Sequence, residues 1–156
     1  MKSLYVYFTV ILLTVISCTD FDPTLEFKID PRLKEYVTSF YQEADERNIP
    51  LHKNLIVKIA FLEPDINGRT KYEGRQRIVI INQSLYDYYI TEFAPKMDPK
   101  HFMLEQLMYH ELGHALLARK HCNDCYSIMS QDLSLHEYAV RPEKRQVLID
   151  ELFTNR

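Results

Sequence analysis

The sequence lacks the surplus of basic residues that marks most nucleic-acid-binding proteins. Lysine and arginine together number 19 against 22 acidic residues, so the formal net charge is −3 and nucleic acid is not an expected partner. The 156 residues include only three glycines and no tryptophan, and they contain no internal repeat and no low-complexity tract. With 46% hydrophobic and 26% charged residues, the composition is that of one folded domain and argues against global disorder.

The apolar run at the N-terminus, residues 4–16, is too short for an ordinary membrane span but suits the hydrophobic region of a signal peptide. It follows Lys2, and residues 15–18 (VISC) resemble a bacterial lipobox. That resemblance implies that residues 1–17 form a lipoprotein signal peptide and that Cys18 is lipidated. The protein is then expected in the bacterial cell envelope, attached to a membrane by its lipid. An ordinary signal peptide or an uncleaved anchor is the alternative.

The remaining chain predicts a small α+β domain over residues 31–156, preceded by a tether or short leading strand over 18–30. Hydrophobic periodicity, capping residues and turn residues predict the elements in this order: a helix at 31–48, a strand at 55–62, a polar excursion at 63–75 around an Asn67-Gly68 turn, a strand at 77–82, a helix from Ser84 to about 93, a buried helix from 99 to about 119, an irregular segment at 121–136, and a closing helix at 142–153.

Residues 110–114, His-Glu-Leu-Gly-His, carry the strongest chemical signal. His110 and His114 are four residues apart on the predicted helix, so both imidazoles lie on one face and can share one ion. Glu111 is then placed to take a proton from a metal-activated water. The helix is apolar nearly all round, and polar groups inside a domain are costly without a purpose. The alternative is that these are satisfied histidines of the core or surface.

A catalytic zinc ion needs a third protein ligand and a free position for water. His121 is the best candidate, because it follows His114 by seven residues, just past the expected helix end, where the chain can turn back. Acidic residues remain as rivals for this position: Asp124, Glu137 and Glu143.

The motif, together with His121 and the string Ser127-Ile128-Met129-Ser130, resembles the metzincin zinc peptidases over about residues 98–130. The resemblance implies a zinc site formed by His110, His114 and His121, with Glu111 as general base and Met129 as a hydrophobic floor beneath the metal. The same residues also resemble those of a set of small bacterial envelope metallopeptidases in which the third histidine follows the second by seven residues, as it does here. A strict metzincin would have glycine at 117 and histidine at 120, where this chain has leucine and lysine. An ordinary residue, Arg119 or Lys120, would then have to turn the chain with positive φ.

Cys122 and Cys125 allow three interpretations: a local disulfide, which an oxidising envelope favours, a redox-active pair, and thiolate ligation of zinc. For the whole chain, the expected function is zinc-dependent hydrolysis of peptide bonds in a peptide or protein substrate. The alternative is a non-catalytic, zinc-stabilised envelope lipoprotein that acts as a binding module. Oligomeric state stays open, as does a role of residues 19–30 as an inhibitory pro-segment.

Overall fold

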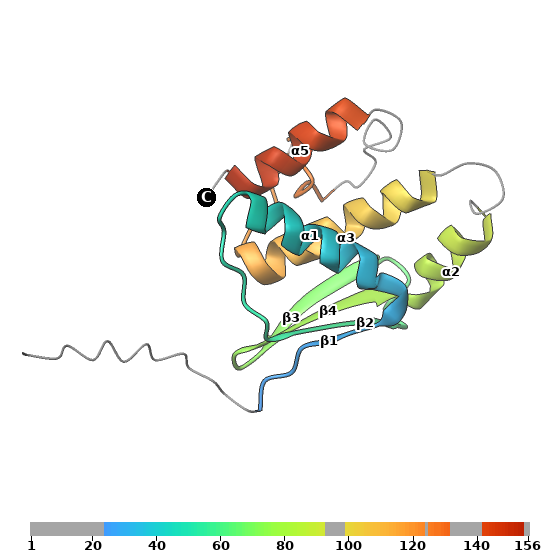
Figure 1. The fold of residues 1–156 in the computed structure, drawn as a ribbon. Helices are drawn as coiled ribbons and strands as arrows, with labels where there is room; N and C mark the ends of the chain where they lie inside the picture. Colours follow the sequence, from blue (N-terminus) through green and yellow to red (C-terminus); the bar gives the residue numbers. More distant parts are fainter. Residues whose placement is uncertain (1–23, 93–98, 124, 132–141, 155–156) are drawn as a thin grey trace, which may run out of the picture.

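The computed structural model describes residues 24–92, 99–123, 125–131 and 142–154. A mixed sheet carries helices on one of its faces (Figure 1). The elements in chain order are β1 (Lys28–Ile29), η1 (Pro31–Leu33), α1 (Lys34–Glu46), β2 (Leu55–Ala60), β3 (Gly68–Glu73), β4 (Gln76–Asn82), α2 (Gln83–Glu92), α3 (Pro99–Leu117) and α5 (Pro142–Thr154). This confirms the predicted α+β class with a short mixed sheet, a buried helix and a C-terminal helix.

The sheet has the strand order β1-β2-β4-β3. β1, β2 and β4 are parallel, and β3 runs antiparallel to β4 along one edge. Because strand side chains alternate between faces, Leu55, Val57, Val79 and Ile81 all point to the helices and join the main hydrophobic core. Strands β2 and β4 therefore present an apolar face to the helices.

Strand β3 corrects the sequence prediction, which treated residues 63–75 as a polar excursion turning at Asn67-Gly68. Residues 68–73 pair with β4, and the tight turn lies at Gly74, which has a φ of 59°. The strand escaped notice because its outer positions, Arg69 and Lys71, are charged and its inner positions hold no large aliphatic residue. Its hydrogen bonds to β4, and not the burial of apolar side chains, give the segment its extended form.

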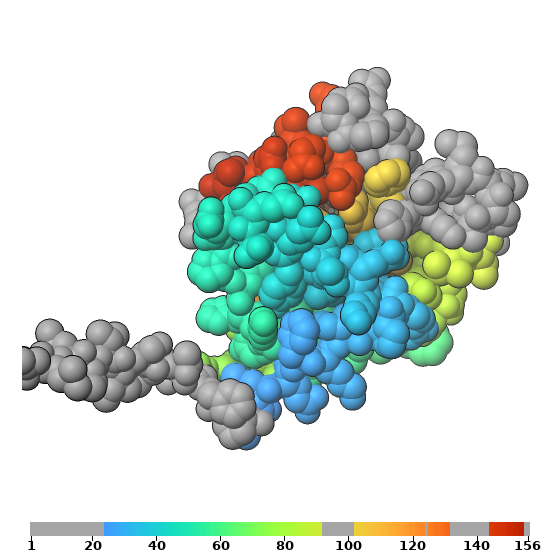
Figure 2. Space-filling model, viewed as in Figure 1, coloured from blue at the N-terminus to red at the C-terminus, as the bar shows by residue number. Residues whose placement is uncertain are grey.

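Helix α3 lies in the middle of the domain, as its all-round apolar character predicts. All ten residues from 104 to 113 are buried. Figure 2 shows that α1 and α5 cover most of α3 on the face in view. Polar side chains inside this helix have partners: Arg145 of α5 donates two hydrogen bonds to Glu105, and the Tyr109 hydroxyl lies 3.0 Å from Ser39 Oγ of α1. Side chains of α1 and α5 thus fix the position of α3, which suits this helix to carry a site.

The N-terminal part of the described chain joins the fold before the first helix. Lys28 and Ile29 pair with β2 as the short leading strand that was one of the two expectations for this segment. Asp30 caps the following turn, since its Oδ1 accepts a hydrogen bond from Arg32 N at 3.0 Å. The signal peptide over 1–17 and the lipidation site Cys18 lie outside the described residues. No helix in the described ranges is long and apolar enough to cross a membrane.

Candidate metal centre

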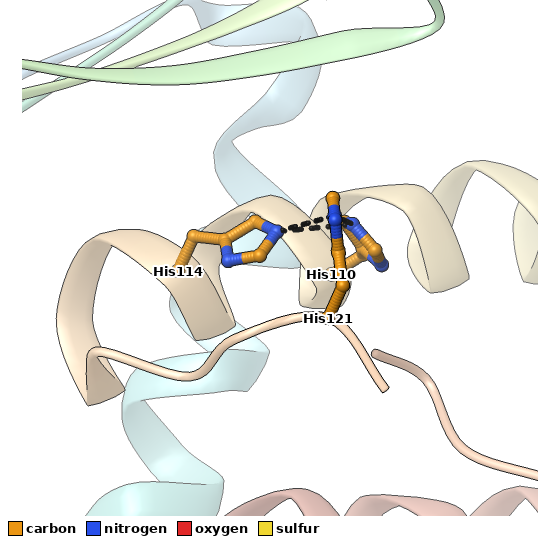
Figure 3. Close-up of side chains that lie close together, drawn as sticks. All are labelled: His110, His114 and His121. Atoms are coloured by element: carbon orange, nitrogen blue, oxygen red, sulfur yellow. Dashed lines mark hydrogen bonds between the residues drawn. The ribbon is translucent and has the colours of Figure 1, made fainter. Parts of the chain in front are cut away.

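Three histidines meet at the C-terminal part of α3 (Figure 3). His110 and His114 project from the helix and His121 projects from the loop that follows it. Their Nε2 atoms form a nearly equilateral triangle: 3.1 Å from His110 to His114, 3.0 Å from His110 to His121 and 3.0 Å from His114 to His121. His110 is buried, His114 half-buried and His121 exposed. These three residues lie close enough together to bind a metal ion.

Backbone carbonyls orient two of the three rings. His110 Nδ1 lies 2.7 Å from the carbonyl oxygen of Ile128, and His114 Nδ1 lies 2.7 Å from that of Arg119. A carbonyl can only accept, so each Nδ1 carries the proton and each Nε2 presents a lone pair. The ring orientation that a metal requires is thus set by groups behind the imidazoles.

The donor set fits a metal ion. Burial lowers the pKa of His110 to about 4 and also lowers the pKa of His114, so both rings are neutral at physiological pH. Two unprotonated nitrogens 3.1 Å apart repel one another unless a cation lies between them. Three imidazoles match the ligand set of catalytic zinc sites, in which Zn–N bonds are about 2.0–2.1 Å. The chemistry of these three residues therefore fits a bound metal ion.

Glu111 lies on the neighbouring face of α3, against the sheet. Its Oε2 accepts a hydrogen bond of 2.7 Å from the Thr70 hydroxyl on β3. Burial raises the pKa of this carboxyl group to about 7, and the Thr70 hydrogen bond acts in the opposite direction. A carboxyl group with a pKa near neutrality can both take up and release a proton.

Alternate residues of β3 contact the face of α3 that carries Glu111 and His114. Gly68 lies directly against Glu111: a Cβ at this position would be 2.7 Å from Glu111 Oε1. Two residues on, Thr70 binds the Glu111 carboxylate, and after another two the Tyr72 hydroxyl donates to the carbonyl of His114 at 2.7 Å. Sequence reasoning missed all three residues. Thr70 and Tyr72 alternate with the charged residues Arg69, Lys71 and Glu73, and this alternation was the available signal.

The loop after α3 brings in the third histidine. Helix α3 ends at Leu117, and Ala118 turns the chain with a φ of 54°. A non-glycine residue does make the turn with positive φ, but one position before the expected Arg119 or Lys120. Ending the helix two residues earlier than predicted leaves enough chain for His121 to return to the face that holds His110 and His114.

A disulfide and a methionine stabilise this loop. Cys122 and Cys125 are joined by a disulfide, with their Cα atoms 5.9 Å apart. The Cys122 amide donates to the carbonyl of Met129 at 3.1 Å, which ties the strand-like ends of the loop together. Met129 is 1% exposed and lies under the helix: a Cβ on Gly113 would be 2.8 Å from its sulfur. Because Gly113 has no side chain, Met129 can pack closely against α3 at this position.

A cleft of about 710 Å³ joins the histidines to β3. It is lined by all three histidines and Glu111, by residues 65–70 and Tyr72, and by Arg119 and Gln131. The acidic rivals for the third ligand position cannot be placed beside it, because Asp124 and Glu137 and the side chain of Glu143 lie outside what the structure describes. Among the described residues, His110, His114 and His121 form the group that could hold a metal.

No protein-family model matches the chain, and neither a curated protein nor a solved structure matches it.

Proposed function

We propose that this protein is a zinc-dependent peptidase in which His110, His114 and His121 bind the metal and Glu111 is the general base. The observation that carries the proposal is the convergence of three histidine Nε2 atoms next to a buried glutamate in one open cleft. The resemblance of residues 98–130 to metzincins supports the same assignment. Zinc bound here would polarise the scissile carbonyl and make a water molecule acidic near neutral pH.

The chain's own residues supply the proton transfers. Glu111 accepts the proton of the attacking water and later delivers it to the leaving amine, in line with the two roles of a general acid–base group. Thr70 keeps the carboxylate in one orientation while it does so, through its hydrogen bond to Oε2. The Ile128 and Arg119 carbonyls keep the histidine rings from rotating.

The position of β3 supports a peptide as the substrate. β3 is an edge strand of the sheet, and residues 68–70 and Tyr72 line the cleft. An edge strand can pair with an extended peptide through main-chain hydrogen bonds, which are independent of the peptide's sequence. A peptide held in this way would pass beside Glu111 and the histidines.

A second candidate function is a zinc-stabilised binding module without catalysis, attached to the bacterial envelope through Cys18. The observation that favours it is the adjacent pair Cys122 and Cys125, since one thiolate of the pair could complete a closed four-ligand site with the three histidines if the disulfide were reduced. The disulfide in the structure supports the catalytic proposal, because a disulfide sulfur has no thiolate to offer a metal.

The experiment is a comparison of the full chain with its Glu111→Gln variant, both loaded with zinc, on a peptide library analysed by mass spectrometry. We expect the wild type to cleave peptides and the variant to lose about 10²–10⁴-fold in turnover, the usual contribution of a general base. Zinc content should be unchanged in the variant, since Glu111 is not a ligand. Equal turnover by both proteins would exclude Glu111 as the base, and no cleavage by zinc-loaded wild type would favour the binding module.

A further inference from the structure

The carboxylate of Glu151, on the C-terminal helix α5, contacts both ends of the loop that carries His121. Its Oε1 accepts a hydrogen bond from the Arg119 guanidinium at 3.1 Å, and its Oε2 accepts one from the Ser127 hydroxyl at 2.7 Å. These two partners are 32 and 24 residues away in the sequence, and they are 8 residues from one another. One side chain therefore closes the base of the loop between positions 119 and 127.

Each of these two contacts lies next to a carbonyl that orients a histidine. The Arg119 carbonyl accepts from His114 Nδ1, and the Arg119 amide donates to Gly113 O at 3.0 Å. Ile128, which follows Ser127 directly, provides the carbonyl that accepts from His110 Nδ1. A shift of either loop end would move a carbonyl away from the ring that it holds.

The Ser127 hydroxyl connects Glu151 to the turn at residues 127–130. Because it donates its only proton to Glu151, its lone pairs are free to accept, and the Met129 amide donates to it at 3.1 Å. The Ser130 amide donates to Ser127 O at 3.1 Å, which closes the turn around Ile128. Ser127 is 3% exposed, so water cannot easily replace these contacts.

Helix α5, which carries the Glu151 carboxylate, is itself fixed by packing in the hydrophobic core. Leu148, Ile149 and Leu152 are at most 2% exposed, and Leu152 lies against Gly113 within the histidine motif. Residues whose own positions are fixed by packing are those best able to position a metal site. The Arg119 and Glu151 side chains are 16% and 28% exposed, so the ion pair is partly shielded from solvent.

We propose that Glu151 is a positioning residue for the metal centre, which acts through Arg119 and Ser127 on all three histidines. The proposal rests on the proposed function, because it assumes that the three histidines bind zinc. It assigns the C-terminal helix a part in metal binding, although that helix contributes no ligand. The consequence is that zinc affinity depends on a carboxylate that never touches the ion.

The test is the zinc dissociation constant of the full chain, measured by competition with a chromogenic chelator for wild type, Glu151→Ala, Glu151→Gln and Asp150→Ala. Outer partners of metal ligands are typically worth about 10–100-fold in affinity, so we expect Glu151→Ala to bind zinc at least tenfold more weakly. Glu151→Gln keeps the shape and one acceptor oxygen, and its affinity should be intermediate. Asp150→Ala is the matched control: it removes the neighbouring carboxylate, which pairs with Arg47 of α1, and should bind zinc as the wild type does.

Melting temperatures of the metal-free proteins separate positioning from a purely structural role. A structural role would lower the melting temperature of metal-free Glu151→Gln while the dissociation constant for zinc stayed at the wild-type value. That result, or wild-type affinity in Glu151→Ala, would overturn the proposal and leave the proposed function intact. If the wild type itself bound no zinc, the proposed function would fall and this inference with it.

Discussion

The two sides of the candidate metal centre are built in different ways. His110 and His114 stand on a helix of which ten consecutive residues are buried, and the distance between them follows from four residues of helical rise. His121 stands on an exposed loop held by a disulfide, by main-chain contacts to Met129, and by Arg119 and Ser127 at its base. The helical side is preorganised by local structure, whereas the loop side depends on contacts between distant parts of the chain.

This difference predicts that the same substitution has different consequences on the two sides. His110→Ala and His121→Ala should each weaken zinc binding by more than about a hundredfold, since even outer contacts of such ligands are worth 10–100-fold. In the metal-free protein, His110→Ala leaves the buried Ile128 carbonyl without its donor and should cost about 1–3 kcal/mol of stability. His121→Ala removes an exposed side chain and should change stability by less than about 0.5 kcal/mol. Urea denaturation in the presence of a chelator measures both, and equal losses would contradict the comparison.

Substitutions at two glycines of the β3–β4 hairpin should have different effects, because one glycine contacts Glu111 and the other lies in the turn, away from the site. A Cβ at Gly68 would lie 2.7 Å from Glu111 Oε1 and 2.9 Å from its Cγ, so Gly68→Ala must displace the carboxylate. We expect turnover to fall by roughly 10–100-fold with zinc content unchanged, because a displacement of about 1 Å in a reacting group can cost a hundredfold.

Gly74→Ala is the control, since nothing lies within 4 Å of a Cβ there and only its φ of 59° is unfavourable. It should lose about 1 kcal/mol of stability and keep its turnover. Full turnover by Gly68→Ala would mean that Glu111 has room to adjust.

The pH dependence of stability distinguishes the glutamate from the histidines. In the metal-free protein, burial lowers the pKa of His110 to about 4, so the free energy of unfolding falls as the pH drops from 6.5 towards 4. Burial raises the pKa of Glu111 to about 7, so its contribution is present below pH 4.5 and is lost as the pH rises through 7. The two trends oppose one another between about pH 4.5 and 6.5.

The Glu111→Gln substitution removes the contribution of the glutamate. The free energy of unfolding of the metal-free variant should therefore rise with pH more steeply than that of the wild type, by up to about 1 kcal/mol per pH unit. Chemical denaturation at several pH values in that window provides the measurement. Parallel curves for the two proteins would mean that folding does not raise the pKa of Glu111.

The turn after α3 gives the smallest expected effect. Ala118 has a φ of 54°, a conformation that costs an alanine but not a glycine, so Ala118→Gly should stabilise the protein by about 0.5–1 kcal/mol. Asn48, two residues beyond the end of α1, has a φ of 55°, and asparagine tolerates this region, so Asn48→Gly should change stability by less than about 0.5 kcal/mol. Thermal denaturation of both variants tests whether the turn at Ala118 is more strained than the turn at Asn48.

The helical part of the site could be predicted from the sequence because its cause is local. The spacing of His110 and His114, the apolar character of the surrounding helix and the position of Glu111 all follow from residues within two helical turns. Helix α3 begins at Pro99 and ends at Leu117, and the closing helix spans residues 142–154. Each of these bounds differs from the predicted one by two residues at most.

The rest of the site depends on contacts that leave little trace in a single sequence. β3 has no apolar alternation, because its inner residues face a polar helix surface and not a hydrophobic core, so Gly68, Thr70 and Tyr72 were missed. Glu151 is one of 22 acidic residues, and nothing nearby in the sequence distinguishes it from the others. His121 could be proposed as a ligand, but only the turn at Ala118 and the contacts at the base of the loop bring it to the other histidines.

X-ray absorption spectroscopy of the zinc-loaded full chain is the most direct test of the metal centre. We expect one zinc ion per chain with three imidazole nitrogens at about 2.0–2.1 Å and one oxygen from water, and one imidazole fewer in the His121→Ala variant. Four protein ligands, a sulfur at about 2.3 Å, or an unchanged spectrum in His121→Ala would contradict the proposed zinc site.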